Sequence, residues 1–264
     1  MDTYNSPLFG EIQQPANFLE LMEFVVILSE MKGRNIMVWR GQGDINWPID
    51  SGAYRRLSNS GSSKRERDLI NYESTLIKRT RHKGYGNNDG ISISDMELLA
   101  KLQHHGAATR LVDFSKNILV ALWFCIDSEP DKMGLLFGVH THYMGGDMEG
   151  ILGENEDYKE VMNDLDKYDY PMFIEPPVVS KRIAAQHAVF LYSSVSSDIT
   201  GSLALPKEKG GTLFIAISPE LKKECRQILI EHFDIRTETL FPDLDGFAFH
   251  ANNAYSRKSD IFRW

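Results

Sequence analysis

Five side chains that can ionise or form hydrogen bonds interrupt an apolar run between residues 98 and 114. They are Gln103, His104, Thr109, Arg110 and Asp113. If the apolar residues around them are buried, each needs a partner, because an unpaired buried polar group costs roughly 1 to 3 kcal/mol. An aspartate three residues after an arginine can orient it, and a histidine in the last turn of a helix is biased towards its charged form. The run predicts either a polar site set into a core or an internal hydrogen-bond network that locks a helix to the next segment.

A second candidate site follows a short apolar strand predicted at residues 36–39, where Arg40 is the first residue after the strand. The next three residues are Gly41, Gln42 and Gly43. A guanidinium can bind a phosphate bidentately, and glycines let a phosphate approach the backbone. The alternative is a structural ion pair, for which Asp44 or Asp50 would be the partner. The one-residue spacing of the glycines is too short to count as a dinucleotide fingerprint.

Three acidic residues surround a proline turn near residue 242: Glu238, Asp243 and Asp245. Capping of a helix N-terminus explains one acid and leaves the other two without a role. We therefore expect at least one of them to act as a base or as the partner of an arginine.

The spacing of apolar residues predicts an alternation of helices and strands. Three- and four-residue steps indicate helices at 15–31, 64–83, 94–105, 117–127, 219–233 and from 239 to about 256. Apolar runs of strand length stand at 36–39, 134–140, 189–192 and 212–217. Ser94 and Glu97 form the capping-box pattern that begins a helix. We predict one α+β domain with a mixed or largely antiparallel sheet flanked by helices, and an acidic insertion or lid at about 141–170.

The composition is that of an ordinary globular protein of 264 residues, with 42% hydrophobic and 25% charged side chains. A net charge of -8 argues against strong nonspecific attraction to nucleic acids. Residues 55–83 are locally basic, which is typical of a solvated helix face or of a nucleic-acid contact. Cys125 and Cys225 form neither a disulfide framework nor a paired-thiol metal motif. We therefore expect a cytoplasmic protein with no metal ion. We also expect no membrane partner, because no apolar run approaches the roughly 18 residues of a membrane span.

Taken in order, the two candidate sites resemble the FRG domain family, which is named for a Phe-Arg-Gly motif. Here that motif reads Trp39-Arg40-Gly41-Gln42. The family's second motif, Gln-His-Tyr-Gly-x-Pro-Thr-Arg-Leu-Leu-Asp-Trp, corresponds to residues 103–114, with substitutions at His105, Ala108, Val112 and Phe114. Further similar segments are Ala121-Leu122-Trp123-Phe124, residues 182–190 and residues 240–246. The resemblance implies a single FRG-like domain over residues 1–264, of a family found largely in bacteria and their phages.

A weaker resemblance links the first motif to mono-ADP-ribosyltransferases, which place an aromatic-Arg-Gly at the end of an early strand, where the arginine holds NAD phosphate. Arg40 and Gly41 match that pattern, whereas the Glu-x-Glu of those enzymes is absent near residue 238. This resemblance implies an ADP-ribosyltransferase-like fold with NAD as substrate. It makes Glu238 and His104 the candidate catalytic residues. The candidate cofactor-binding residues are Arg40, Gly41, Gln42, Gln103, Thr109, Arg110 and Asp113.

Two functional hypotheses follow. The first is an NAD-using transferase or glycohydrolase in bacterial or phage conflict, in which Glu238 or a nearby aspartate stabilises the ribosyl cation. The second is a nonenzymatic nucleotide or nucleic-acid binding module, or a sensor, that uses Arg40, Arg110 and the basic residues 55–83. Both predict a nucleotide-like small molecule as ligand, with a nucleic acid or a protein as a further target. In both, we expect Arg40 to touch the ligand and Asp113 to support Arg110.

Overall fold

The computed structural model describes residues 1–31, 37–59, 61, 65–88, 90–146, 157–165, 167–176, 181–244 and 246–248. One eight-stranded sheet runs through the molecule in the order β1-β2-β10-β7-β3-β6-β9-β8. Its strands are β1 (Asp2–Ser6), β2 (Gly10–Gln14), β3 (Met37–Gln42), β6 (Val112–Ser115), β7 (Gly134–His140), β8 (Met172–Ile174), β9 (Ala188–Tyr192) and β10 (Thr212–Ile217). All neighbours are antiparallel except β2 and β10. The predicted α+β class with a largely antiparallel sheet is confirmed.

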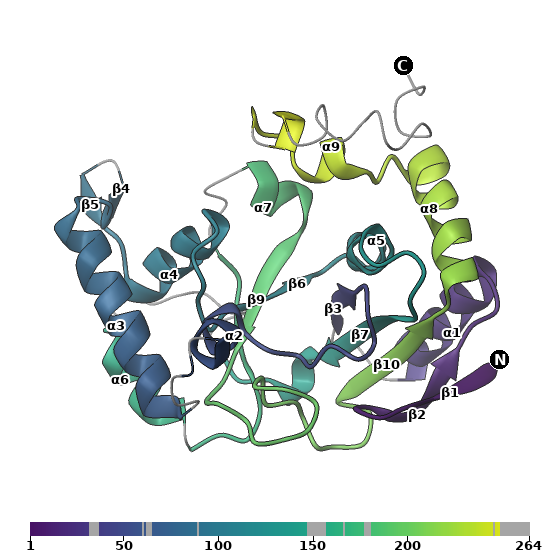
Figure 1. The fold of residues 1–264 in the computed structure, drawn as a ribbon, viewed down its shortest axis with the longest axis horizontal. Helices are drawn as coiled ribbons and strands as arrows, with labels where there is room; N and C mark the ends of the chain where they lie inside the picture. Colours follow the sequence, from purple (N-terminus) through teal and green to yellow (C-terminus); the bar gives the residue numbers. More distant parts are fainter. Residues whose placement is uncertain are drawn as a thin grey trace.

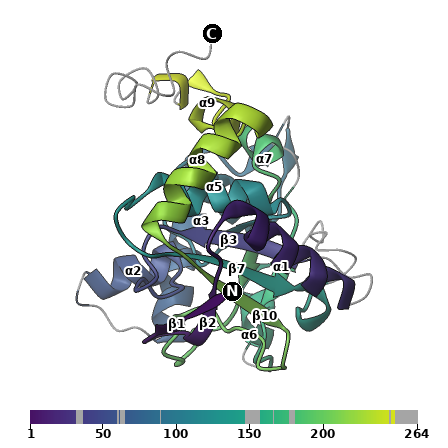
Figure 2. The ribbon, with the colours of Figure 1, turned by 90° about the vertical axis from the view of Figure 1, so that its right-hand side faces the viewer.

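Helices pack in two groups on either side of the molecule (Figure 1). The first group is α1 (Phe18–Met31), α5 (Ile118–Asp127) and α8 (Pro219–Phe233), which share one apolar core with β3, β7 and β10. Figure 2 shows these three helices stacked beside one another. The second group is α3 (Glu66–His82), α4 (Asp95–His104) and α6 (Tyr158–Leu165), which pack on β8 and β9. Shorter elements are α2 (Gly52–Asn59), η1 (Thr141–Tyr143), α7 (Lys181–Ala185), α9 (Thr237–Leu240) and the hairpin β4 (Asn87–Asn88) and β5 (Ile91–Ser92).

The helix boundaries follow local capping chemistry. The Ser94 hydroxyl accepts a hydrogen bond from the Glu97 backbone N–H, as the capping pattern predicts, and Asn117 caps α5 in the same way. α5 is apolar on nearly all sides because sheet and α8 cover it, and Trp123 is fully buried. The strands predicted at 134–140 and 212–217 are confirmed at both ends.

Two predicted segments differ from the structure, and one hairpin was not predicted. β3 continues through Gln42, so Arg40 lies inside a strand and not after one. The helix predicted from residue 239 is interrupted: α9 ends at Leu240, before Pro242, and Leu244 and residues 246–248 are helical again. The part of the prediction beyond residue 248 lies outside the described residues. The hairpin of β1 and β2 was not predicted, because its polar residues carry no apolar alternation.

The acidic segment 141–170 is described in part. Its helix α6 packs against α3, with Tyr158, Met162 and Leu165 buried in the core of the second helix group. Residues 147–156 and residue 166 lie outside the described residues. Among the helices that the structure describes, none combines the length and the apolar character needed to cross a membrane.

Candidate functional site

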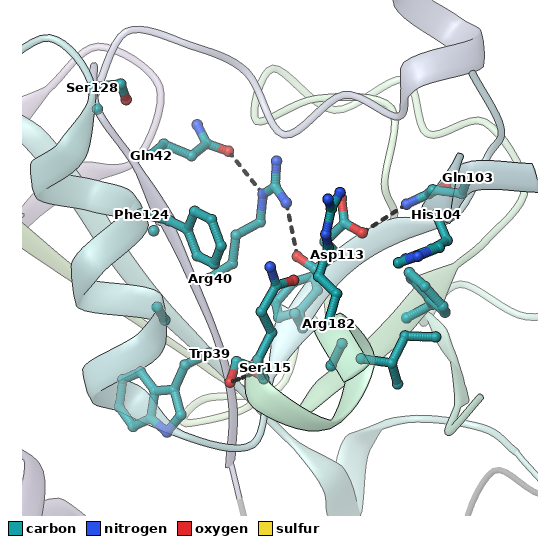
Figure 3. A pocket seen from close by; sticks show the side chains of 18 of the residues that line it. Trp39, Arg40, Gln42, Gln103, His104, Asp113, Ser115, Phe124, Ser128 and Arg182 are labelled. Atoms are coloured by element: carbon teal, nitrogen blue, oxygen red, sulfur yellow. Dashed lines mark hydrogen bonds between the residues drawn. The ribbon is translucent and has the colours of Figure 1, made fainter. Parts of the chain in front are cut away.

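A cavity of about 400 Å³ opens where two neighbouring strands separate. In the described sheet β3 pairs with β6 only through Trp39 and Ser115, whereas β3 continues to Gln42 along β7. Beyond that single pair the two strands diverge. α5, α7 and the end of α4 complete the walls. Figure 3 shows side chains from β3, β6, α4 and α7 converging on this space.

Arg40 reaches across the gap between the strands. Its Nη1 donates to the backbone carbonyl of Asp113 at 2.8 Å, and its Nε lies 3.5 Å from Oε1 of Gln42 (Figure 3). The guanidinium thus satisfies a carbonyl that faces no strand partner on that side. Asp44 is paired instead with Lys132 at 3.0 Å, and Asp50 accepts from the Ser202 backbone N–H.

The charge of Arg40 is therefore left without a carboxylate ion pair among the described residues. Burial lowers the pKa of Arg40, the nearby charge of Asp113 raises it, and the charge of Arg55 lowers it. The guanidinium stays protonated all the same, because the ordinary arginine pKa lies above 12. The Nη2 amine makes no hydrogen bond to any residue that the structure describes. A half-buried, incompletely paired cation in a cavity wall is suited to an anionic ligand.

Gln103 holds the side chain of Asp113. Its Nε2 donates to Oδ1 of Asp113 at 2.9 Å, and its Oε1 accepts the hydroxyl hydrogen bond of Thr109. Thr109 is buried and lies behind the cavity wall. The chain from Thr109 through Gln103 to Asp113 thus connects the end of α4 to β6, and it positions the carbonyl that receives Arg40.

Arg110 lies in a different environment. Its side chain is 1% exposed and outside the cavity lining. Nε donates to Glu73 at 2.7 Å, Nη1 to Glu66 at 2.8 Å and Nη2 to the Tyr158 hydroxyl at 2.9 Å. Burial lowers the pKa of Arg110, but Glu73, Tyr158 and Glu66 raise it above its ordinary value. The expectation that Asp113 supports Arg110 is wrong, because these groups from α3 and α6 already occupy the guanidinium.

His104 lies in the cavity wall near an ion pair from the C-terminal part of the chain. Arg182 and Asp243 form a bidentate pair, with contacts of 2.9 and 2.8 Å, and the Arg182 guanidinium lies 4.9 Å from the Phe241 ring centre. Burial lowers the pKa of His104, with Arg182 and His105 acting in the same direction and Asp243 opposing them. Asp243 is thus an acid of this turn that partners an arginine, as predicted for at least one of the three.

Glu238 is not part of this wall. It forms an ion pair with Arg236 at 3.1 Å on α9, and the cavity lining does not include it. Asp245 lies outside the described residues. Asp113 is the carboxylate that lines the cavity.

The glycines of the first motif have a packing role. A Cβ atom on Gly41 would lie 2.0 Å from the Ala121 carbonyl oxygen and 2.6 Å from the Cys125 backbone nitrogen. One on Gly43 would lie 2.2 Å from the Ser128 hydroxyl. Glycine is therefore needed at both positions because α5 and Ser128, the residue after it, pack directly on this part of the chain. Both glycines also line the cavity, so the approach of a phosphate to their backbone stays a prediction.

Lys222 of α8 holds two parts of the cavity rim together, and sequence reasoning missed it. Its side chain is buried, and Nζ donates to the carbonyls of Gly43 at 2.6 Å and Glu129 at 2.8 Å. Burial lowers the pKa of Lys222. A signal was present, because Lys222 lies on the same helical stripe as the buried residues Cys225 and Leu229.

The cavity combines positive charge with aromatic surface. Arg40, Arg55 and Arg182 line it, and the carboxylates of Asp113 and Asp243 offset two of these charges. One positive charge remains in excess with His104 neutral, and two remain when His104 is protonated. The aromatic side chains in the lining are Trp39, Trp47, Phe114, Phe124, Phe190 and Phe241. No cluster of three metal-binding side chains occurs in the part of the chain that the structure describes.

Comparison with known proteins gives one match. Residues 35–133, less than half of the chain, match the family model of the FRG domain. This stretch supplies Arg40, Gln103, Asp113 and the α5 wall, whereas Arg182 and Phe241 come from outside it. No curated protein and no solved structure matches the chain.

Proposed function

Because residues 35–133 carry an FRG domain whose cavity is lined by arginines and aromatic rings, we propose that this chain binds a phosphate-bearing nucleotide there, of the class to which NAD belongs. The observation that carries the proposal is the state of Arg40. Its guanidinium faces the cavity with a backbone carbonyl and a distant amide as its hydrogen-bond partners among the described residues. The oxygens of a phosphate would accept hydrogen bonds from the guanidinium N–H groups that have no partner among the described residues.

The dimensions and the lining support a nucleotide over inorganic phosphate alone. A cavity of about 400 Å³ falls within the range of roughly 300 to 1,000 Å³ typical of small-molecule sites. Phe124 and Phe241, whose ring centres are 6.1 Å apart, provide flat apolar surface beside the arginines. A nucleotide presents a planar base and an anion on one molecule, and each finds a matching surface here.

With NAD in the cavity, Asp113 is the residue suited to the chemistry of ribosyl transfer. In such a reaction the bond between nicotinamide and ribose C1′ breaks, and the electron pair leaves with nicotinamide. An oxygen of water or of a target then bonds to C1′ and loses its proton. A carboxylate can stabilise the cation formed at C1′ and take up that proton. Asp113 lines the cavity and Glu238 does not, so the proposal assigns this role to Asp113.

Calorimetric titration of the whole chain with AMP, ADP, NAD and nicotinamide riboside tests the binding. We expect the three phosphate-bearing ligands to bind, and nicotinamide riboside to bind at least about tenfold more weakly, because it lacks phosphate. Arg40→Gln should remove that difference. Arg67→Gln, on the exposed face of α3, is the matched control and should bind like the unaltered protein.

Equal binding of all four ligands, or of the Arg40→Gln and Arg67→Gln variants, would contradict the proposal. Chromatography of the same mixtures separates the two forms of the hypothesis. Release of nicotinamide from NAD indicates an enzyme, and binding without release indicates a nucleotide-binding module.

A further inference from the structure

A second concave surface lies away from the cavity, between the C-terminal halves of α3 and α4. This basic groove has a volume of about 750 Å³ and lies at the edge of the molecule that carries the hairpin of β4 and β5 (Figure 1). The two sites are on different sides of the end of α4, because His104 lines the cavity and the next residue, His105, lines the groove.

The floor of the basic groove is aliphatic. Leu76 of α3 and Leu102 of α4 are half-buried and form its surface, and Leu98 of α4 is fully buried beneath them. Tyr85, in the turn after α3, adds one aromatic ring that is 65% exposed. A floor of this kind gains free energy when apolar side chains of another molecule cover it.

The rim of the groove is positively charged. Four cations stand on it, Lys78, Arg79, Lys83 and Lys101, and none of the described residues that line it is acidic. None of the four forms an ion pair with a residue that the structure describes. Arg81 on the same helix behaves differently, because it is paired with Asp95 at 2.6 Å and faces another surface.

The helix dipoles account for only part of this charge. α3 and α4 both end at the groove, and each C-terminus carries the equivalent of roughly half a negative charge. Two termini therefore offset about one of the four cations. Arg79 and Lys83 are also four residues apart, a like-charge spacing that destabilises a helix by roughly 0.2 to 0.5 kcal/mol. Folding alone thus does not explain why the cations gather here.

We propose that the basic groove binds an acidic peptide segment of another protein, one that carries aliphatic side chains between its carboxylates. Its leucine-like side chains would cover the half-buried Leu76 and Leu102, and its carboxylates would meet the four cations of the rim. Charge complementarity favours this occupant, and the floor favours it over a nucleic acid. Single-stranded nucleic acid binds on successive aromatic rings. Among the described residues of the groove, Tyr85 is the one Phe, Tyr or Trp side chain, beside the imidazoles of His82 and His105.

A fluorescence anisotropy experiment tests the proposal. The probes are a labelled 16-residue helical peptide of leucine and glutamate, its counterpart with lysine for glutamate, and a labelled oligothymidine. We expect the acidic peptide to bind the full chain and the lysine peptide to bind at least about tenfold more weakly. The double variant Arg79→Glu/Lys83→Glu should weaken binding of the acidic peptide by about tenfold, because two attractions become repulsions.

The matched control is Lys209→Glu/Lys223→Glu, which changes the net charge equally at two exposed lysines outside the groove. It should change binding less than twofold. Leu102→Asp, which places a charge on the floor, should also weaken binding, and circular dichroism checks that it folds. Equal losses in both charge-reversal variants, no preference for the acidic peptide, or a loss confined to the oligothymidine would each overturn the proposal.

Discussion

Two arginines in the stretch that matches the FRG domain model, Arg40 and Arg110, have opposite environments. Arg110 is buried, and two carboxylates and a tyrosine hydroxyl surround its guanidinium. Arg40 is half-buried beside a cavity, and a carbonyl and an amide oxygen are its hydrogen-bond partners among the described residues. A buried guanidinium whose N–H groups all have partners cannot also bind a ligand. A guanidinium at a cavity that has fewer partners still has N–H groups to donate. The comparison teaches that the same side chain can be fully compensated in one motif and left incompletely paired at a cavity in the other, which is the state that the proposed binding needs.

The largest effect is expected for Arg110→Met. Glu73 is 0% exposed, and without its partner it would keep a buried charge, which destabilises proteins by about 3 to 5 kcal/mol. Urea unfolding measures the loss. Adding Glu73→Leu to the same chain should recover part of it, since the orphaned carboxylate is then gone. Arg67→Met is the exposed control, and a loss there as large as that of Arg110→Met would remove the contrast.

Gly41→Ala should have the next largest effect, because the new Cβ would collide with the backbone of α5. Overpacking of this kind costs about 1 to 3 kcal/mol. Gly52→Ala is the matched control: its Cβ would lie 3.4 Å from the nearest atom, an ordinary contact. Thermal unfolding of both variants distinguishes a packing role of the motif glycine, next to Arg40, from a role in ligand approach. An unchanged melting temperature for Gly41→Ala would refute the packing role.

Arg40→Lys tests whether the arginine at the cavity contributes to ligand binding and not to stability. Lysine keeps the charge and loses the planar fork, so we expect ADP to bind about tenfold more weakly. The free energy of unfolding should fall by no more than about 1 kcal/mol, because the substitution weakens one hydrogen bond, the one to the Asp113 carbonyl. Calorimetry and urea unfolding give the two numbers. If Arg40→Lys lost stability as Arg110→Met does, the two arginines would have the same role.

Asp113→Asn separates the role of the Asp113 carboxylate from that of its backbone carbonyl. Its backbone carbonyl would still accept from Arg40, while the negative charge beside the proposed phosphate site would be gone. We expect ADP to bind about threefold more tightly, because a like-charge repulsion is removed. Release of nicotinamide from NAD, where the chain catalyses it, should fall sharply in the same variant. Weaker ADP binding would show that the carboxylate itself orients Arg40.

The smallest effect concerns the pH dependence contributed by His104. Its pKa in the folded protein lies below the ordinary value of about 6.5, so on acidification the unfolded chain takes up this proton first. The stability contributed by the neutral imidazole is present above pH 6.5 and is lost as the pH falls through the lower folded-state pKa. Urea midpoints at pH 7.5 and 5.5 should therefore differ less in His104→Gln than in the unaltered chain. An equal difference in both would place His104 in open solvent.

Much of the fold was predictable because its causes are local. Hydrophobic periodicity located α1, α5 and α8, a serine cap located the start of α4, and apolar runs located β7 and β10. β6 escaped prediction because its four residues are too few to show a period. α7 and α9 are also too short to show one, and packing on the cavity wall positions them.

The sequence by itself determined which residues carry the two motifs, and it indicated that at least one acid near Pro242 acts as a base or pairs with an arginine. Only the tertiary structure decided which motif arginine is available, because the partners of Arg110 come from α3 and α6, 37 and 48 positions away. The structure also shows that Glu238 pairs with Arg236 outside the cavity lining and that Lys222 binds carbonyls at the cavity rim. It shows as well that α5 packs too closely on Gly41 for a side chain to fit there. Periodicity and capping act between neighbours along the chain. Burial and charge compensation depend on segments that meet only after folding.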